Sequence, residues 1–290
     1  MLFSNPILDL IRGRKSVRTY EREPVPPESR QALESFLGSL PGPPFGSAVR
    51  LLAVSADPDD PYALKGLGTY GIIRNPAGFI IGAVQPSDDG LFDFGFLMEA
   101  ACLKLLDLGL GSCWLGGSFR KSRFAGRIGS REGEIVPSVL SFGVPSGKKS
   151  WIERVVTAGA GSAARLPFED LFFDGDFSHP LTAAAAGTAA VALESVRLGP
   201  SASNRQPWRI VRDDRDGSFH FFLRMSAAYQ RQLKWVGAVN LQAVDMGIAA
   251  CHFSLAAEAT GLKGRWRRVP GPPPSDPDAG LYVVSWSPAE

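Results

Sequence analysis

The chain of 290 residues repeats itself in order, and this repetition limits the folds that it can adopt. Ala32-Leu-Glu-Ser35 recurs as Ala192-Leu-Glu-Ser195, and each copy lies in a helical pattern that leads into a loop containing proline. Asp93-Phe-Gly95 recurs as Asp245-Met-Gly247, and an apolar helix, a Gly-Leu pair and a tryptophan follow both copies at the same spacing. Single short matches arise by chance, but two ordered pairs with matching element types indicate a duplicated unit.

Hydrophobic periodicity predicts a similar order of helices and strands in each half. In the first half, helices are expected over 5–12, 27–40 and 91–108, and strands over 49–54, 79–84 and 136–143. In the second half, helices are expected over 181–198 and 239–261, and strands over 208–211, 219–224 and 282–286.

The predicted fold class is therefore α+β, with two pseudo-equivalent halves whose mixed or antiparallel sheets are wrapped by helices. The join is expected within residues 151–180, where periodicity is weak, and the halves are taken as residues 1–165 and 166–290. Because each half alone is too thin to cover both faces of a sheet, we expect one interlocked body.

Charge, cysteine usage and hydropathy exclude several classes of protein. The chain has 31 basic and 29 acidic residues, a balance that argues against a nucleic-acid-binding protein. Its three cysteines show no paired spacing, which argues against a disulfide framework or a zinc knuckle. No signal-peptide pattern is present, and the best apolar run stops well short of the roughly 20 residues of a membrane span. We expect a cytoplasmic protein with no membrane partner.

The strongest local signal is the loop Pro200-Ser-Ala-Ser-Asn-Arg-Gln-Pro-Trp208. Its two prolines restrict the backbone at both ends, while Ser201, Ser203 and Asn204 crowd the turn with hydroxyl and amide groups. Such a loop can present backbone N–H groups and short polar side chains to a planar polar ring. A helix C-terminus capped by a Ser/Asn turn explains the same composition equally well.

A second signal is the basic segment Arg14-Lys-Ser-Val-Arg18. Alternate side chains of an extended segment point the same way, so Arg14, Ser16 and Arg18 can converge on one anion. Two guanidinium groups and a hydroxyl suit a phosphate. A solvated basic edge is the alternative, and for a charge cluster taken alone it is the more common outcome.

A third signal is Leu108-Gly-Leu-Gly-Ser-Cys-Trp-Leu-Gly-Gly117, which follows the predicted helix over 91–108. Gly109 occupies the position after a helix where left-handed backbone is needed. Gly116 and Gly117 would let the main chain approach a ligand closely. The alternative, a helix end followed by an edge strand, requires only Gly109.

Together, Arg-x-Ser-x-Arg, Pro-Ser-x-x-Asn-x-Gln-Pro-Trp and Gly-Leu-Gly-Ser-Cys-Trp resemble motifs of the FMN-dependent nitroreductase family. The strand ending at Gly143-Val-Pro145 is similar to a late strand and turn of that family, and Arg165-Leu-Pro167 resembles its second phosphate contact. The resemblance implies non-covalently bound FMN and ping-pong hydride transfer from NADH or NADPH. The acceptor would be a small, electron-poor molecule of nitro or quinone type.

The resemblance also assigns roles to residues. The FMN phosphate would be held by Arg14, Ser16, Arg18 and Arg165. The flavin ring or ribityl chain would be bonded by Ser201, Ser203 and Asn204. Gly116 and Gly117 would bring a backbone N–H to flavin N5, and no side chain is expected as a catalytic acid. The acidic residue common in the family before the second glycine is absent, since Gly116 stands there.

The order of motifs departs from an ordinary member, in which both motifs occur in each subunit and each flavin lies at a dimer interface. Here the basic segment occurs only in the first half and the intact serine loop only in the second. The first-half counterpart, Leu40-Pro-Gly-Pro-Pro-Phe-Gly-Ser47, has lost the polar side chains. The chain is similar to an internally duplicated branch of the family, a monomer acting as a pseudo-dimer with one complete site and one degraded site.

Other interpretations remain open at the level of sequence. A flavin-binding protein without turnover, serving as a sensor or store, and a flavin-free interaction module both accommodate a degraded half-site. Gly66-Leu-Gly-Thr-Tyr-Gly71 matches the dinucleotide pattern but lacks the flanking strand and helix. The histidines are too far apart for a metal site, no Gly-x-Ser-x-Gly elbow occurs, and Cys113 is expected to be a packed thiol.

Overall fold

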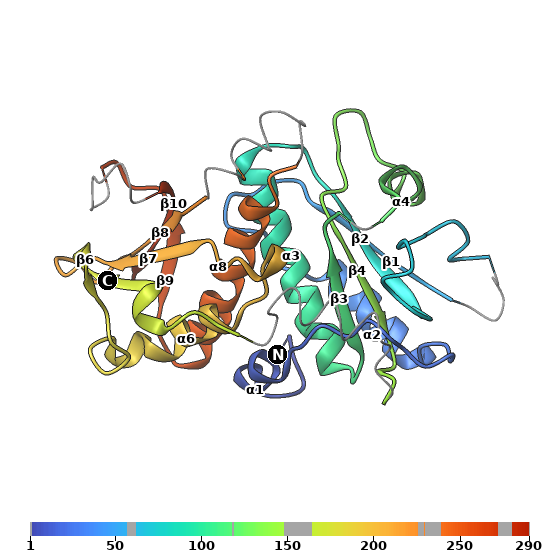
Figure 1. Cartoon of the computed structure of the whole chain (residues 1–290), viewed down its shortest axis with the longest axis horizontal. Coiled ribbons are helices and arrows are strands. Elements are labelled where there is room, and N and C mark those ends of the chain that lie inside the picture. The colour runs from blue at the N-terminus through green and yellow to red at the C-terminus, as the bar shows by residue number, and fades with distance from the viewer. Residues whose placement is uncertain are drawn as a thin grey trace. The chain divides into compact units, whose positions relative to one another are not determined.

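In the computed structural model, the chain divides into two units, Met1–Ser162 (unit 1) and Ala163–Glu290 (unit 2). The structure describes residues 2–56, 62–117, 119–147, 164–225, 229, 239–271 and 280–289. Each unit combines helices with a sheet of its own (Figure 1), so the predicted α+β class is confirmed.

Unit 1 consists of a four-stranded antiparallel sheet with helices packed against it. Its elements are α1 (Ile7–Gly13), α2 (Pro27–Gly38), β1 (Arg50–Ser55), β2 (Gly78–Ala83), α3 (Asp88–Asp107), β3 (Gly111–Leu115), α4 (Lys121–Ile128) and β4 (Val139–Gly143). The strand order is β1-β2-β4-β3, and every neighbouring pair is antiparallel. Strand β3 therefore forms one edge of this sheet.

Unit 2 contains a six-stranded mixed sheet. Its elements are β5 (Phe172–Asp174), β6 (Asp176–Pro180), α6 (Ala190–Leu198), β7 (Trp208–Arg212), β8 (Phe219–Leu223), α8 (Leu241–Ala259), β9 (Gly264–Arg267) and β10 (Leu281–Pro288), with short 3-10 turns at Phe168–Asp170, Gly187–Ala189 and Ala202–Asn204. The strand order is β6-β5-β7-β8-β10-β9, and β5 pairs with β7 in parallel.

The four strands β7-β8-β10-β9 repeat the order and the antiparallel directions of β1-β2-β4-β3. A long buried helix, α3 or α8, joins the second and third strands in chain order of each set. Both helices are followed by a left-handed glycine, Gly109 with φ 75° and Gly261 with φ 77°. The two units thus share one topology, which gives the repeated sequence motifs a common structural setting.

The repeated aspartates near the start of α3 and α8 perform the same task. Asp93 accepts hydrogen bonds from the main-chain N–H groups of Phe45 (3.1 Å) and Ser47 (2.9 Å). Asp245 accepts one from the N–H of Ala202 (2.9 Å), while its Oδ2 is buried with no hydrogen-bond partner among the described residues. In each unit a buried carboxyl therefore fixes the loop that leads from the preceding helix into the first strand of the repeat.

The two aspartates differ in how strongly hydrogen bonds oppose the effect of burial on their pKa. Burial raises the pKa of Asp93, against the opposing effect of two backbone hydrogen bonds. Burial raises the pKa of Asp245 to about 8, and only one backbone hydrogen bond opposes it. Asp245 is therefore protonated in the folded chain at neutral pH, whereas the unfolded chain releases this proton near pH 4.

Several predicted elements need correction. The helix expected over 181–198 begins only at Ala190, because Gly187 adopts φ 56° and interrupts the helical path. The weakly periodic join expected over 151–180 contains β5 and β6, while residues 151–163 lie outside the described residues. Helix α4 was not predicted, since its eight residues carry only two buried apolar side chains, Phe124 and Ile128.

The aspartate pair yields a testable contrast in stability. Asp245→Asn keeps an oxygen for the Ala202 N–H and removes the titrating proton. The wild-type unfolding free energy should fall as pH rises from 4 to 8, by up to about 1.4 kcal/mol per pH unit from this group. The variant should lose this decline and be at least as stable as the wild type at pH 8, measured by urea unfolding followed by circular dichroism.

Asp93→Asn serves as the matched comparison. There the new amide NH₂ must face a main-chain N–H, because both carboxylate oxygens of Asp93 already accept one. The variant should be less stable than the wild type by about 1–3 kcal/mol near neutral pH. The difference should be larger at lower pH, because the raised pKa of Asp93 makes the wild type less stable as pH rises. Equal effects of the two substitutions would contradict the assigned difference between the two sites.

Candidate functional site

The basic segment Arg14–Arg18 lies against the edge strand β3. Ser16 forms a parallel bridge with Ser112, and the N–H of Val17 donates to the carbonyl of Ser112 at 2.8 Å. A Cβ on Gly111 would lie 2.9 Å from the Cβ of Val17, so this close approach requires glycine. The structure therefore brings together two motifs that the sequence analysis singled out, the basic segment and the glycine-rich stretch after α3.

Arg14 borders a small hollow formed by these two segments. Its Nε is buried and has no hydrogen-bond partner among the described residues. The walls of the hollow combine the basic and glycine residues of the two segments with four apolar side chains. The hollow is lined by Gly13, Arg14, Lys15, Val17, Leu106, Gly109, Leu110, Gly111, Ser112 and Pro145. Its volume of about 60 Å³ is far below the roughly 300–1,000 Å³ of pockets that enclose whole ligands. A group the size of a phosphate fits this setting, and a flavin ring does not.

Tyr20 fixes the far end of the basic segment. Its hydroxyl donates to the carbonyl of Val17 at 2.6 Å and also lies 3.0 Å from the hydroxyl of Ser141 on β4. The carbonyl of Arg18 accepts a hydrogen bond from the N–H of Arg74 at 2.8 Å. The path of residues 14–20 is thus set by backbone contacts on both sides, and burial raises the pKa of Tyr20 well above its usual value.

Neither cysteine beside this segment is suited to thiol chemistry. Cys102 and Cys113 are buried, and burial raises the pKa of Cys102 far above that of a free thiol. The reactive form of cysteine is the thiolate, which such surroundings disfavour. Cys113 is packed in the core of unit 1, as predicted.

Gly116 and Gly117 follow β3 directly. Gly116 is half-buried and Gly117 exposed, and a Cβ on Gly117 would meet no atom within 4 Å. No described neighbour therefore requires glycine at position 117. Along an extended strand, four residues span about 13 Å, so Gly116 lies well beyond the point where Ser112 meets Ser16. An elongated ligand could contact both ends of this strand.

In unit 2, the loop from Pro200 to Trp208 has a strained backbone. Three residues without the freedom of glycine adopt left-handed conformations, Ser203 (φ 51°), Asn204 (φ 53°) and Gln206 (φ 47°). Such conformations cost on the order of 1–3 kcal/mol each for residues that rarely adopt them, and they cluster at functional sites. The loop is held by a hydrogen bond from the N–H of Gln206 to Ser201 Oγ at 2.9 Å and by Asp245.

Arg165 and Asn204 take part in holding this loop. Arg165 Nη1 donates to Asn204 Oδ1 at 3.0 Å, and Nη2 donates to the carbonyl of Leu198 at 3.2 Å. Asn204 Nδ2 donates to the carbonyl of Ala164 at 2.8 Å. The structure thus brings Arg165 to the serine loop, where both side chains make contacts within unit 2. Ser203 is exposed, and the Ser201 hydroxyl accepts its bond from Gln206 while keeping its own hydrogen as a donor.

The corresponding loop of unit 1 differs in chemistry. In 40–47, Phe45 packs edge-on against Phe92 at 5.1 Å between ring centroids, and only Gly46 has a left-handed backbone. The loop is apolar and unstrained apart from that glycine. Only the unit 2 copy combines strain with accessible hydroxyl groups.

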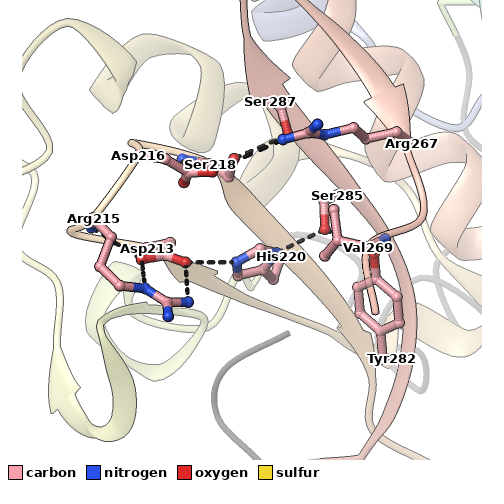
Figure 2. Close-up of polar contacts among 10 residues, drawn as sticks. All are labelled: Asp213, Arg215, Asp216, Ser218, His220, Arg267, Val269, Tyr282, Ser285 and Ser287. Carbon is pink, nitrogen blue, oxygen red and sulfur yellow. Dashed lines mark hydrogen bonds and ion pairs between the residues drawn. The ribbon is translucent and has the colours of Figure 1, made fainter. Parts of the chain in front are cut away.

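Unit 2 also contains a Ser–His–Asp arrangement that the sequence analysis missed. Ser285 Oγ lies 2.7 Å from His220 Nδ1, and His220 Nε2 lies 3.4 Å from Asp213 Oδ2, as Figure 2 shows. Arg215 binds the same carboxylate and holds the pKa of Asp213 far below its usual value. Because an ionised Asp213 can only accept, His220 carries its proton on Nε2 and accepts from Ser285. The sequence predicted the two strands that carry His220 and Ser285. It did not predict that these residues lie opposite each other, because this depends on the register between the strands.

This arrangement is structural. His220 is 2% exposed and Ser285 fully buried, and Ser285 Oγ is also bonded to the hydroxyl of Tyr282 at 2.8 Å. Burial lowers the pKa of His220 and favours the neutral ring. A hydrolytic nucleophile must reach its substrate, and the buried Ser285 cannot. The three residues therefore satisfy one another's hydrogen-bonding groups within the sheet.

Two other classes of function receive no support from the described residues. No group of three or more histidine, cysteine, aspartate or glutamate side chains there is arranged to hold a metal ion. None of the helices described is long and apolar enough to cross a membrane. Gly66–Gly71 lies in turns and coil, without the strand and helix of a dinucleotide-binding fold.

Comparisons with solved structures found several similar proteins. The structure of a “putative nitroreductase” from Thermotoga maritima is similar over 98% of this chain and 94% of that chain, with a TM-score of 0.61 and 18% identity. An FMN-dependent nitroreductase from Clostridium difficile matches 49% of this chain and 88% of its own, with a TM-score of 0.40 and 19% identity. A “Putative NADH dehydrogenase/NAD(P)H nitroreductase” from Bacteroides thetaiotaomicron matches 51% and 90%, with a TM-score of 0.39 and 22% identity.

A search of curated protein sequences returned no match. The family model described as “Putative TM nitroreductase” matches residues 6–257. This match spans most of the chain and includes the basic segment, the glycine-rich strand and the serine loop. The protein therefore belongs to this nitroreductase-type family of oxidoreductases.

Proposed function

We propose that the chain is an FMN-dependent oxidoreductase that takes electrons from NADH or NADPH and reduces a small, electron-poor acceptor of nitro or quinone type. Family membership supports the oxidoreductase class. The observation that carries the cofactor assignment is the buried Arg14 Nε without a hydrogen-bond partner among the described residues, beside a phosphate-sized hollow.

The phosphate contact rests on the basic segment. A buried guanidinium N–H that lacks an acceptor lowers the stability of the folded chain. A negatively charged phosphate oxygen that accepts this N–H would remove that cost. Arg14 and Ser16 lie on the stretch that pairs with β3, and Arg18 follows two residues later. These three residues bind the phosphate, with their backbone positions fixed by β3 and by Arg74.

The ring and ribityl contacts rest on the serine loop. Ser201 and Ser203 supply hydroxyl groups, and Asn204 holds the loop through its hydrogen bonds with Arg165 and with the carbonyl of Ala164. The strain at 203–206 is retained because the fixed shape presents these groups without rearrangement. Arg165 donates a hydrogen bond to Asn204 of this loop. Any contact of Arg165 with the FMN phosphate would therefore be made next to Asn204.

Bound FMN would supply two-electron redox chemistry, with NADH or NADPH as the electron donor and the acceptor reduced in a separate half-reaction. The chain would position the cofactor, and Gly116 and Gly117 would present main-chain N–H groups to its ring. No thiol takes part, since the cysteines beside the basic segment are buried.

The absorbance spectrum of the purified chain is the direct test. A flavin band near 450 nm that is bleached by NADH or NADPH without oxygen, and restored by a quinone or nitroaromatic compound, is expected. A flavin that is bound but never bleached would identify a non-catalytic flavoprotein. A colourless chain that takes up no added FMN would exclude the cofactor assignment.

Arg14→Ala and Arg18→Ala should each weaken FMN retention while leaving the fold intact. Loss of one guanidinium–phosphate contact should reduce affinity roughly tenfold or more. FMN release can be followed by fluorescence, and circular dichroism reports the fold. Arg12→Ala is the matched control, because Arg12 is exposed and pairs with Asp9. Wild-type retention in both test variants would remove the phosphate assignment.

The chain should bind one FMN and should do so without a second chain. The basic segment and the polar loop each occur once, so only one complete set of contacts exists. An FMN set against the apolar loop 40–47 with no basic segment would leave its phosphate without cations, which is strongly disfavoured. Flavin released per mole of protein, together with mass by light scattering, measures this. Two FMN per chain, or binding only by a dimer, would contradict it.

A further inference from the structure

A second exposed surface of unit 1 is formed by the Gly66–Gly71 loop and the start of α4. The N–H of Arg120 donates to the carbonyl of Gly68 at 3.2 Å. A Cβ on Gly68 would lie 3.4 Å from Arg120 Nε, and one on Gly66 would lie 3.8 Å from Cδ of Arg123. Two arginine side chains therefore lie over the glycine positions of this loop, which belongs to the cyan segment before β2 in Figure 1.

This surface is strongly basic in a chain that is nearly neutral overall. Residues 62–74 and 119–128 contain six lysine or arginine residues and no acidic residue, against a net charge of +2 for the whole chain. Five of these cations form no ion pair within the part of the chain that the structure describes, namely Lys65, Arg74, Arg120, Lys121 and Arg123. Asp57, Asp59 and Asp60 precede the loop and lie outside the described residues.

Two tyrosines frame the same loop. Tyr62 is 67% exposed and Tyr70 68% exposed, more than any other large apolar or aromatic side chain described. The ammonium group of Lys65 lies 4.9 Å from the ring centroid of Tyr62. Tyr70 adopts a left-handed backbone with φ 50°, an unfavourable conformation for a bulky residue, and holds its ring in solvent. Exposed rings beside cations that form no ion pair with a described residue suit a ligand that has both an aromatic base and phosphate groups.

Both ends of this surface are tied to segments of the proposed FMN contacts. The N–H of Arg74 donates to the carbonyl of Arg18 at 2.8 Å. Arg120 follows Gly117 by three residues, so their Cα atoms lie no more than about 11 Å apart. A reductant that delivers its hydride near Gly116 and Gly117 can therefore extend over the Gly66–Gly71 loop.

We propose that this surface binds the adenosine-phosphate end of the nicotinamide dinucleotide and makes NADPH the preferred reductant over NADH. The proposal rests on the function proposed above for the same site. Arg120 and Arg123 bind the phosphate that distinguishes NADPH, and an exposed tyrosine stacks on the adenine. The Gly-x-Gly-x-x-Gly pattern thus serves a nucleotide through a surface loop that is covered by arginines.

Isothermal titration with adenosine 2′,5′-bisphosphate and adenosine 5′-monophosphate tests the surface without any turnover. The wild-type chain should bind the bisphosphate at least about tenfold more tightly than the monophosphate. Arg120→Ala and Arg123→Ala should each weaken bisphosphate binding by roughly tenfold. Arg265→Ala, which removes an exposed arginine of β9 in unit 2, should change nothing.

In the flavin-loaded chain, the same two variants should raise KM for NADPH about tenfold while leaving kcat, KM for NADH and FMN content unchanged. Equal affinity for the two nucleotides, or unaltered affinity in both variants, would overturn the proposal. Tighter binding of a 20-nucleotide single strand that is weakened by the same substitutions would replace it with a nucleic-acid surface. Selective bisphosphate binding by a chain that takes up no flavin would instead reject the oxidoreductase mechanism and keep the nucleotide site.

Discussion

A buried carboxyl that bonds the main chain of a neighbouring loop is the contact on which each unit depends. Asp93 and Asp245 stand at equivalent points of α3 and α8, and both fix the loop between the preceding helix and the first strand of the repeat. Main-chain N–H groups that lack partners in the interior are costly. The carboxyl therefore helps to give the loop one shape, while the side chains on the loop differ between the units.

The difference between the two loops shows how a repeated fold can specialise. In unit 1 both oxygens of Asp93 are satisfied, and the loop packs Phe45 on Phe92. In unit 2 one oxygen of Asp245 has no partner among the described residues, and the loop carries three strained residues. Backbone strain and an unbonded carboxyl oxygen thus occur in the unit whose loop exposes polar groups, a pattern typical of sites that bind ligands. The apolar loop has gained packing and lost the hydroxyl groups.

Sequence patterns predicted the long helices, the central strands and the topology class, because burial imposes periodicity on them. They failed where the signal was short or local. Helix α4 has too few buried positions, and the strands β5 and β6 are only three and five residues long. The basic segment, the glycine-rich strand and the serine loop were recognised by residue type. The hydrogen bonds that join Arg165 to Asn204, and Ser285 to His220, depend on backbone paths that no pattern specifies.

Solvent accessibility and backbone strain distinguish buried polar clusters of this chain, which are structural, from exposed ones, which are suited to ligands. The Ser285–His220–Asp213 chain has the order of a catalytic triad, yet it is buried and its hydrogen bonds are mutually satisfied. All five non-glycine residues with left-handed backbone among the described residues lie in two places, the loop at 203–206 and the segment 70–75. Both places expose polar or aromatic side chains to solvent. A folded chain tolerates such conformations where surrounding contacts enforce them, so these two surfaces are the ones best suited to bind ligands.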